Sequence, residues 1–204
     1  MRPLCILLLL LAAASGQAQT QLVVFVGDSI THECDWAARL GDSHIVNRGV
    51  PGDTTRDILS RMDSVADPRA RAYFIMAGIN DLKRGIPRAE TVSNIRKMIR
   101  ILKQASPDAA IVLQSILPVN SRVRPFAFET SLVKDVNDEL RQIAGEKARV
   151  AFLDLYPLFL DEHGRLKKEL TRDGLHLNAA GYDVWVELLR KEGFPPAAPV
   201  SVVE

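Results

Sequence analysis

The chain has 204 residues, of which 47% are hydrophobic and 25% charged, a composition typical of one globular domain with a sizeable core. Its 26 basic and 25 acidic residues leave a formal net charge of +1, and no run of basic residues disturbs this balance. We therefore expect no nucleic acid as a partner and no attraction to anionic membranes by charge, and we expect a small molecule or a glycan instead.

The first 18 residues have the pattern of a secretory signal peptide. Arg2 supplies positive charge, Leu4–Ala14 is apolar, and Gly16-Gln17-Ala18 has small residues at both ends, as in a cleavage site. The apolar stretch of about a dozen residues is too short to span a bilayer, which takes about 20. We expect export to the periplasm or the medium after cleavage near Ala18, without integral membrane association.

The predicted cleavage removes one of the two cysteines. Cys5 lies in the predicted signal peptide, so Cys34 is the single cysteine expected in the mature chain. One cysteine excludes an internal disulfide. We interpret Cys34 as a small, partly buried apolar residue without a catalytic role.

After the signal peptide, segments typical of strands alternate with segments typical of helices. Five apolar runs have the continuous pattern of strands that are covered on both faces. These runs are Leu22–Val26, His44–Asn47, Tyr73–Met76, Ile111–Leu117 and Val150–Leu153.

Four sets of apolar residues recur with the period of a helix. They are Ile58, Leu59, Met62 and Val65; Val92, Ile95, Ile99 and Leu102; Leu132, Val133, Val136, Leu140 and Ile143; and Tyr182, Trp185, Leu188 and Leu189. The alternation predicts an α/β fold with three layers (α/β/α), flavodoxin-like, with about five mainly parallel strands. We place this single domain at residues 19–193 and a Pro-rich, extended C-terminal tail at residues 194–204.

Polar residues follow several of the predicted strands. Ser29 follows the first strand, Gly49 the second and Asn80 the third, and the loop from Asp173 to His176 lies between the fifth strand and the last helix. Because ligands bind beyond the carboxyl ends of the strands in open parallel sheets, we expect these residues to meet at one edge.

The chemistry of this set is that of a serine nucleophile. The run from Val23 ends abruptly at Gly27-Asp28-Ser29, which predicts a serine exposed on a sharp turn. A serine hydroxyl needs a base and a group that orients the base, and His176 and Asp173 are the candidates. Attack on an ester also requires donors for the developing oxyanion.

Three donors for this oxyanion are available in the sequence. They are the backbone N–H groups of Ser29 and Gly49 and the side-chain amide of Asn80. Gly49 suits the role because a residue without a side chain lets a backbone amide approach a ligand closely.

Taken in order, these motifs resemble those of the SGNH, or GDSL, hydrolase family over essentially the whole mature chain. Residues 27–29 resemble the first family block, Gly49 the second, residues 78–81 the third and residues 173–176 the last. The stretch 52–56 is also similar to the subgroup that contains the catalytic subunits of intracellular platelet-activating-factor acetylhydrolase.

The resemblance implies a serine esterase that needs no metal and no other cofactor and prefers short acyl groups such as acetyl. It implies Ser29 as nucleophile, His176 as general base and then acid, and Asp173 as the group that orients the imidazole. The implied oxyanion hole consists of Ser29, Gly49 and Asn80. Thr31 stands where the Gly-x-Ser-x-Gly motif has its last glycine, so an α/β-hydrolase elbow is not supported.

Each motif alone has a simpler interpretation. Ser29 is then a helix N-cap, Asn80 a turn residue, and Asp173 with His176 a loop hydrogen bond or a pair of metal ligands. The sequence has no further His or Cys at ligand spacing, so we predict no metal site.

The other histidines stay outside the predicted catalytic set. We interpret His32, with Glu33 beside it, as part of a solvated helix start, His44 as a structural residue of the second strand, and His163 as part of a surface turn.

The expected function is that of an exported carboxylic-ester hydrolase acting on O-acetylated glycans or small acetyl esters. A lysophospholipase or thioesterase of the same family is an alternative. A non-catalytic glycan-binding module is the alternative from another class. The related subunits form dimers, so a homodimer remains open and the oligomeric state is not predicted.

Overall fold

The computed structural model describes residues 21–194, and its centre is a sheet of five strands. The strands are β1 (Leu22–Gly27), β2 (Ile45–Gly49), β3 (Ala70–Met76), β4 (Ala110–Gln114) and β5 (Val150–Leu153). They lie in the order β2-β1-β3-β4-β5, and every neighbouring pair is parallel. The predicted flavodoxin-like α/β fold is confirmed. The predicted signal peptide, residues 1–18, lies outside the described residues.

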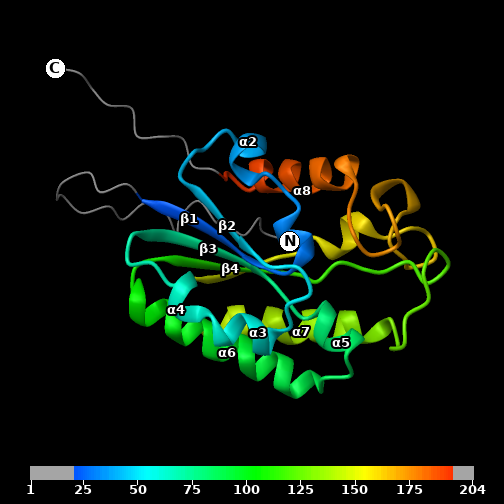
Figure 1. Cartoon of the computed structure of the whole chain (residues 1–204), viewed down its shortest axis with the longest axis horizontal. Coiled ribbons are helices and arrows are strands. Elements are labelled where there is room, and N and C mark those ends of the chain that lie inside the picture. The colour runs from blue at the N-terminus through cyan, green and yellow to red at the C-terminus, as the bar shows by residue number, and fades with distance from the viewer. Residues whose placement is uncertain (1–20, 195–204) are drawn as a thin grey trace.

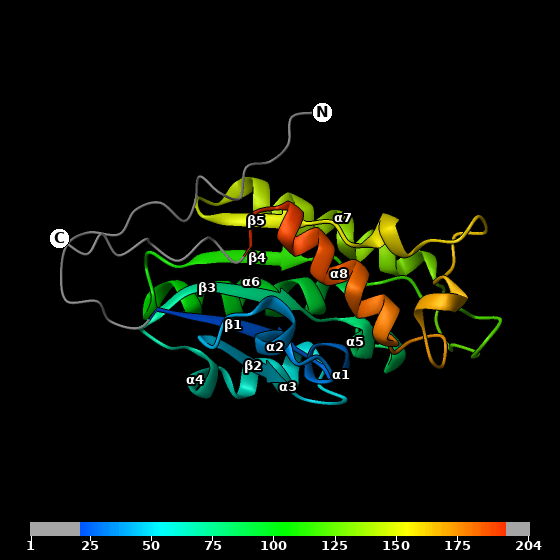
Figure 2. The same ribbon diagram turned by 90° about the horizontal axis from the view of Figure 1, so that it is seen from above.

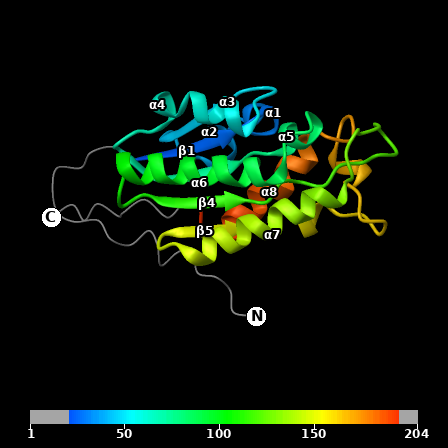
Figure 3. The ribbon, with the colours of Figure 1, turned by 90° about the horizontal axis from the view of Figure 1, so that it is seen from below.

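Helices cover both faces of the sheet, as Figure 1 shows from the side and Figures 2 and 3 show from the two faces. One face carries α2 (Trp36–Leu40) and α8 (Ala179–Lys191). The other face carries α3 (Thr55–Ser60), α4 (Met62–Val65), α6 (Arg88–Ala105) and α7 (Ser131–Glu146). Within residues 21–194, none of the helices is both long enough and apolar enough to cross a membrane.

Short elements gather at the end of the sheet toward which the strands run (Figure 2). The helices α1 (Ser29–His32) and α5 (Ile79–Lys83) follow β1 and β3 there, and the 3-10 turns η2 (Tyr156–Phe159) and η3 (Lys168–Leu170) precede α8. In a parallel sheet all strands deliver their carboxyl ends to the same edge, so this edge collects the polar segments.

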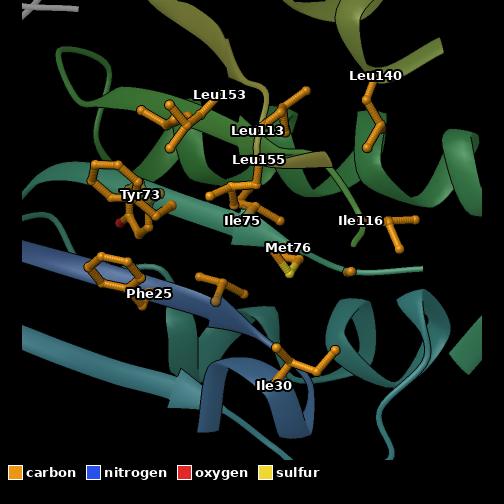
Figure 4. Close-up of a cluster of buried hydrophobic side chains, with 14 of the residues drawn as sticks. Phe25, Ile30, Tyr73, Ile75, Met76, Leu113, Ile116, Leu140, Leu153 and Leu155 are labelled. Carbon is orange, nitrogen blue, oxygen red and sulfur yellow. The ribbon is translucent and has the colours of Figure 1, made fainter. Parts of the chain in front are cut away.

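The buried side chains form one core between the sheet and the helices (Figure 4). Phe25 stacks between Trp36, at 4.3 Å between ring centroids, and Phe74, at 4.8 Å. Phe194 joins this cluster with its ring 4.6 Å from that of Phe74, and only 2% of the residue is exposed. The domain therefore includes Phe194, where we had placed the first residue of the tail. Residues 195–204, the rest of that tail, lie outside the described residues.

The helix predicted over Ile58 to Val65 is interrupted. Arg61 has φ −110° and ψ 15° and separates α3 from α4. Its guanidinium donates to Asp53 at 2.7 Å and to the carbonyl oxygen of Arg48 at 3.0 Å. We attribute the break to these long-range contacts, which the local apolar pattern does not record.

Two predicted strands include residues that lie outside the observed strands. His44 precedes β2 and its side chain is 54% exposed, so it is not a structural strand residue. The predicted strand Ile111–Leu117 ends at Gln114, because the backbone of Ile116 bonds to the side chain of Asn137 instead of to a neighbouring strand. Asn137 accepts the N–H of Ile116 at 2.8 Å and donates to its carbonyl at 2.9 Å.

Candidate active site

The turn after β1 presents Ser29 at the first position of α1. Asp28 is the N-cap of this helix, and its carboxylate accepts the N–H of Ile30 at 3.0 Å. Asp28 is almost fully buried; burial raises its pKa to about 6 against the opposing effect of the Ile30 hydrogen bond. The N–H of Ser29 donates to no group within residues 21–194, which leaves it available to a ligand.

A chain of hydrogen bonds links Ser29 to His176 and Asp173. The Oγ of Ser29 lies 3.0 Å from Nε2 of His176, and Nδ1 of the same ring lies 2.8 Å from Oδ2 of Asp173. A proton on Nδ1 is held by the carboxylate, so Nε2 is left as the acceptor for the serine hydroxyl. The structure brings together the three residues that the sequence selects, across 147 positions of the chain.

Asp173 is held as a carboxylate. Its Oδ1 accepts the N–H of Leu175 at 3.1 Å and that of His176 at 2.8 Å. Partial burial acts to raise the pKa of Asp173, but the bonds from the His176 ring and from these two N–H groups outweigh it and lower the pKa to about 2. The carboxylate is therefore charged and oriented at neutral pH.

The loop that carries His176 is fixed by its own hydrogen bonds. The hydroxyl of Thr171 donates to the carbonyl of His176 at 2.7 Å and accepts the N–H of Gly174 at 3.0 Å. Gly174 has φ +83°, and a Cβ there would lie 2.8 Å from the carbonyl oxygen of Asn120. Only glycine meets both demands without strain, so the loop geometry depends on it.

Asn80 lies on α5 with its amide fixed at both ends. Its Nδ2 donates to the carbonyl of Asp53 at 3.0 Å, and its Oδ1 accepts from Nζ of Lys83 at 3.2 Å. The residue is only 4% exposed. An amide nitrogen has two protons, so one N–H remains for a ligand.

Gly49 differs from its predicted state. Its N–H donates to Oδ1 of Asn47 at 2.9 Å, so this donor is occupied, whereas the sequence predicts it free for an oxyanion. The lack of a side chain still matters, because a Cβ on Gly49 would lie 2.4 Å from the backbone nitrogen of His32. Gly49 therefore lets β2 pack directly against the helix that carries Ser29.

Asn47 is a supporting residue that the sequence analysis missed. Its Nδ2 lies within hydrogen-bond distance of the carbonyls of Thr31, His32 and Cys34, at 3.0, 3.1 and 2.9 Å. These carbonyls are at the C-terminal end of α1, where backbone acceptors lack helical partners. The signal available in the sequence was an Asn two residues before the glycine of the second motif.

Asp81 forms a second support, next to Asn80. Its buried carboxylate accepts the N–H of Thr55 at 2.8 Å, the hydroxyl of Thr55 at 2.5 Å and that of Thr91 at 3.2 Å. Burial raises the pKa of Asp81, while the Thr55 and Thr91 bonds oppose the rise. These bonds tie α5 to α3 and α6 and so fix the backbone that carries Asn80.

The remaining candidate side chains lie outside the hydrogen-bonded chain. His32 and Glu33 are exposed as predicted but lie at the C-terminal end of α1, not at a helix start; Nδ1 of His32 contacts the carbonyl of Gly49 at 3.1 Å, and Glu33 is paired with Arg172. His163 is exposed in a turn, as its neighbours predict. Cys34 is buried, and burial raises its pKa to about 12, consistent with an apolar role. Within residues 21–194 no three His, Cys, Asp or Glu side chains form a metal-binding group.

Comparison with known proteins gives consistent similarities. The model of the GDSL-like lipase/acylhydrolase family matches residues 25–184. The chain is 26% identical over 164 residues to platelet-activating factor acetylhydrolase IB subunit alpha1 of Bos taurus. The matched region covers 78% of this chain and 69% of that protein.

Two solved structures extend this similarity. A Streptococcus pneumonia protein provisionally described as a platelet activating factor is 30% identical with a TM-score of 0.80, and the match covers 86% of this chain and 85% of that one. A catalytic mutant of an acetylxylan esterase from Geobacillus stearothermophilus is 22% identical with a TM-score of 0.69, covering 85% and 94%. The second likeness concerns the fold.

Proposed function

Because the chain belongs to the GDSL-like lipase/acylhydrolase family, a family of ester-hydrolysing enzymes, we propose that it hydrolyses acetyl esters through an acyl-serine intermediate on Ser29. The observation that carries the proposal is the unbroken chain of hydrogen bonds from Ser29 through His176 to Asp173. The two predicted resemblances, to this family and to the acetylhydrolase subgroup, are confirmed.

In the acylation step, Oγ of Ser29 attacks the ester carbonyl carbon and Nε2 of His176 takes the hydroxyl proton. The carbonyl oxygen becomes an oxyanion, which receives the N–H of Ser29 and the remaining amide N–H of Asn80. The imidazolium, stabilised by Asp173, then returns the proton to the leaving alcohol as the carbon–oxygen bond breaks.

Deacylation repeats these roles with water. Nε2 of His176 takes a proton from water, the resulting hydroxide attacks the acyl carbon, and the proton passes to Oγ of Ser29 as the acid leaves. For Gly49 to be the third oxyanion donor, its N–H must be shared between Asn47 and the substrate. We propose Ser29 and Asn80 as the main donors and Gly49 as this shared one.

The acetyl preference is supported by the names of the relatives. One is a platelet-activating factor acetylhydrolase subunit, and a neighbour in fold is an acetylxylan esterase. Both names describe release of an acetyl group. Together with the signal-peptide pattern of the first 18 residues, this supports O-acetylated glycans or small acetyl esters outside the cytoplasm as substrates.

The test is hydrolysis of 4-nitrophenyl esters from acetyl to long acyl chains by the chain from residue 19 onward and by its Ser29→Ala variant. We expect Ser29-dependent release that is fastest for acetyl and falls with chain length. A preference for long chains would replace the proposal by a lysophospholipase or thioesterase. Absence of Ser29-dependent release on every ester would contradict the esterase role and leave a binding module.

Export needs a separate test. The full chain is expressed with a C-terminal tag, and the N-terminal sequence of the recovered protein is determined. We expect export and a new N-terminus close to residue 19. Retention inside the cell with an intact N-terminus would refute this part of the proposal.

A further inference from the structure

Cationic side chains from two segments flank the candidate catalytic residues. Lys83, on α5, donates through Nζ to the Asn80 amide oxygen at 3.2 Å. Arg124 belongs to the segment between β4 and α7, and its Nη1 lies 3.4 Å from Oδ2 of Asp173. Figure 2 shows both segments at the end of the sheet where the strands finish. Each cation therefore contacts a residue of the candidate site: Lys83 contacts the proposed oxyanion donor, and Arg124 contacts the carboxylate that orients His176.

These two charges are poorly neutralised by the protein. Within residues 21–194, no carboxylate lies within 4.0 Å of the Lys83 ammonium. The carboxylate that Arg124 approaches is Asp173, which is already bonded to the ring of His176 and must stabilise the imidazolium. A ligand with a negative charge would supply the missing partner.

The pKa of Lys83 indicates that Arg124 lies close enough to act on the charge of Lys83. Partial burial lowers the pKa of Lys83, Arg124 lowers it next, and Asp28 acts in the opposite direction. Like charges near one another raise the free energy of the site when only one weak ion pair, Arg124 with Asp173, offsets them, and an anion that binds between them relieves this cost. Both residues are exposed, so their side chains are accessible to a ligand.

A nearby arginine gives a contrast. Arg84 follows Lys83, but its guanidinium donates to the carbonyl of Gly52 at 2.8 Å and lies 3.4 Å from Asp57. Arg84 is thus held by a backbone acceptor as well as by its ion pair, whereas the Arg124 guanidinium contacts only Asp173 among the described residues. We assign it no direct part in ligand binding.

We propose that the natural substrate carries an anionic group, a carboxylate or a phosphate, on the alcohol side of the ester bond, and that Lys83 and Arg124 bind this group. The inference rests on the proposed acetylesterase function. An acetyl group carries no ionisable group, so the anionic group must belong to the leaving alcohol. The cations then determine which alcohols are accepted.

The test compares matched acetyl esters that differ in charge. The probes are 4-acetoxybenzoate, its neutral amide 4-acetoxybenzamide, and 4-acetoxyphenyl phosphate. For each ester, kcat/KM is divided by the rate constant for hydrolysis by hydroxide, which removes differences in intrinsic reactivity. We expect the wild type to favour one or both anionic esters over the amide by about tenfold or more, and we expect added salt to reduce this preference.

Substitutions identify the side chains that cause the preference for anionic esters. Arg124→Gln and Lys83→Gln should each lower the anionic-to-neutral ratio about threefold or more. The ratio is the informative quantity, because any damage to Asp173 or Asn80 affects both esters alike. Arg100→Gln, which removes an exposed cation of α6, is the matched control and should leave the ratio unchanged.

The outcomes separate this inference from the function on which it rests. Preference for the carboxylate or for the phosphate supports the inference and identifies the anion. Ser29-dependent hydrolysis of all three esters at similar normalised rates, unaffected by Arg124→Gln, would overturn the inference and leave the esterase intact. Loss of Ser29-dependent hydrolysis on all three would overturn the proposed function and the inference with it.

Discussion

Replacement of Asn80 by alanine tests the proposed oxyanion hole. In the structure the amide of Asn80 is buried, donates to Asp53 and accepts from Lys83, so its free N–H is held in one direction. Asn80→Ala removes this donor and leaves the catalytic serine and histidine in place. We therefore expect the rate of the chemical step to fall, while the Ser29–His176 hydrogen bond is retained.

The size of the effect follows from the contacts. Loss of one oxyanion donor costs a factor of about 10² to 10³ in kcat. The variant also removes the hydrogen bond to the partly buried carbonyl of Asp53, and an unsatisfied acceptor costs up to about 1–3 kcal/mol of folding free energy. We expect kcat for 4-nitrophenyl acetate to fall by this factor with little change in KM, and urea unfolding to report the loss of stability.

Asn94 provides a matched control on α6. It is also buried, its Nδ2 donates to Thr55 at 3.1 Å, and its Oδ1 accepts from Lys97, three residues further on, at 3.5 Å. Asn94→Ala should destabilise the fold to a similar extent but change kcat by less than about threefold. An Asn80→Ala enzyme with kcat within threefold of the wild type, or an equal loss in both variants, would refute the oxyanion role.

Three further substitutions test the structural support of the site. Gly49→Ala should reduce kcat at least tenfold and destabilise the fold by about 1–3 kcal/mol, because its Cβ would meet the backbone of His32; steady-state kinetics with normal values would contradict this. Burial raises the pKa of Asp28 to about 6, so the stability of the wild type relative to Asp28→Asn should be greatest below about pH 4 and fall as the pH rises to about 6. Urea unfolding of both proteins across this pH range measures the difference in stability, and a difference that does not change with pH would refute the prediction. Phe194→Ala should cost about 3–5 kcal/mol in the same assay, since the ring packs against Phe25 and Phe74; a loss below about 1 kcal/mol would show that the domain ends before Phe194.

The proximity of the candidate catalytic residues was predictable from the sequence. A buried strand that ends at Ser29 and a loop before the last helix both belong to the carboxyl edge of a parallel sheet. Asp173 and His176 are three residues apart on one loop, which already confines their side chains to one region. The roles of these residues in catalysis remain predictions for the experiments above.

Contacts between side chains and backbone were not predictable. The hydrogen bond from Gly49 to Asn47 depends on how β2 turns at its end, and the bond from Lys83 to Asn80 depends on a short helix that the apolar pattern does not reveal. Likewise, Arg61 interrupts a regular apolar period through contacts with distant residues, and Phe194 is buried by tertiary packing although it adjoins a Pro-rich stretch. Local periodicity carries no information on such contacts.

Covalent labelling with a fluorophosphonate tests the central claim most directly. The reagent is added to the protein in slight excess, esterase activity toward 4-nitrophenyl acetate is followed, and the modified peptide is identified by mass spectrometry. We predict one label on Ser29, lost activity in proportion to labelling, and no label in Ser29→Ala. Full activity after complete labelling of Ser29, or inactivation by a label on another residue, would contradict the account.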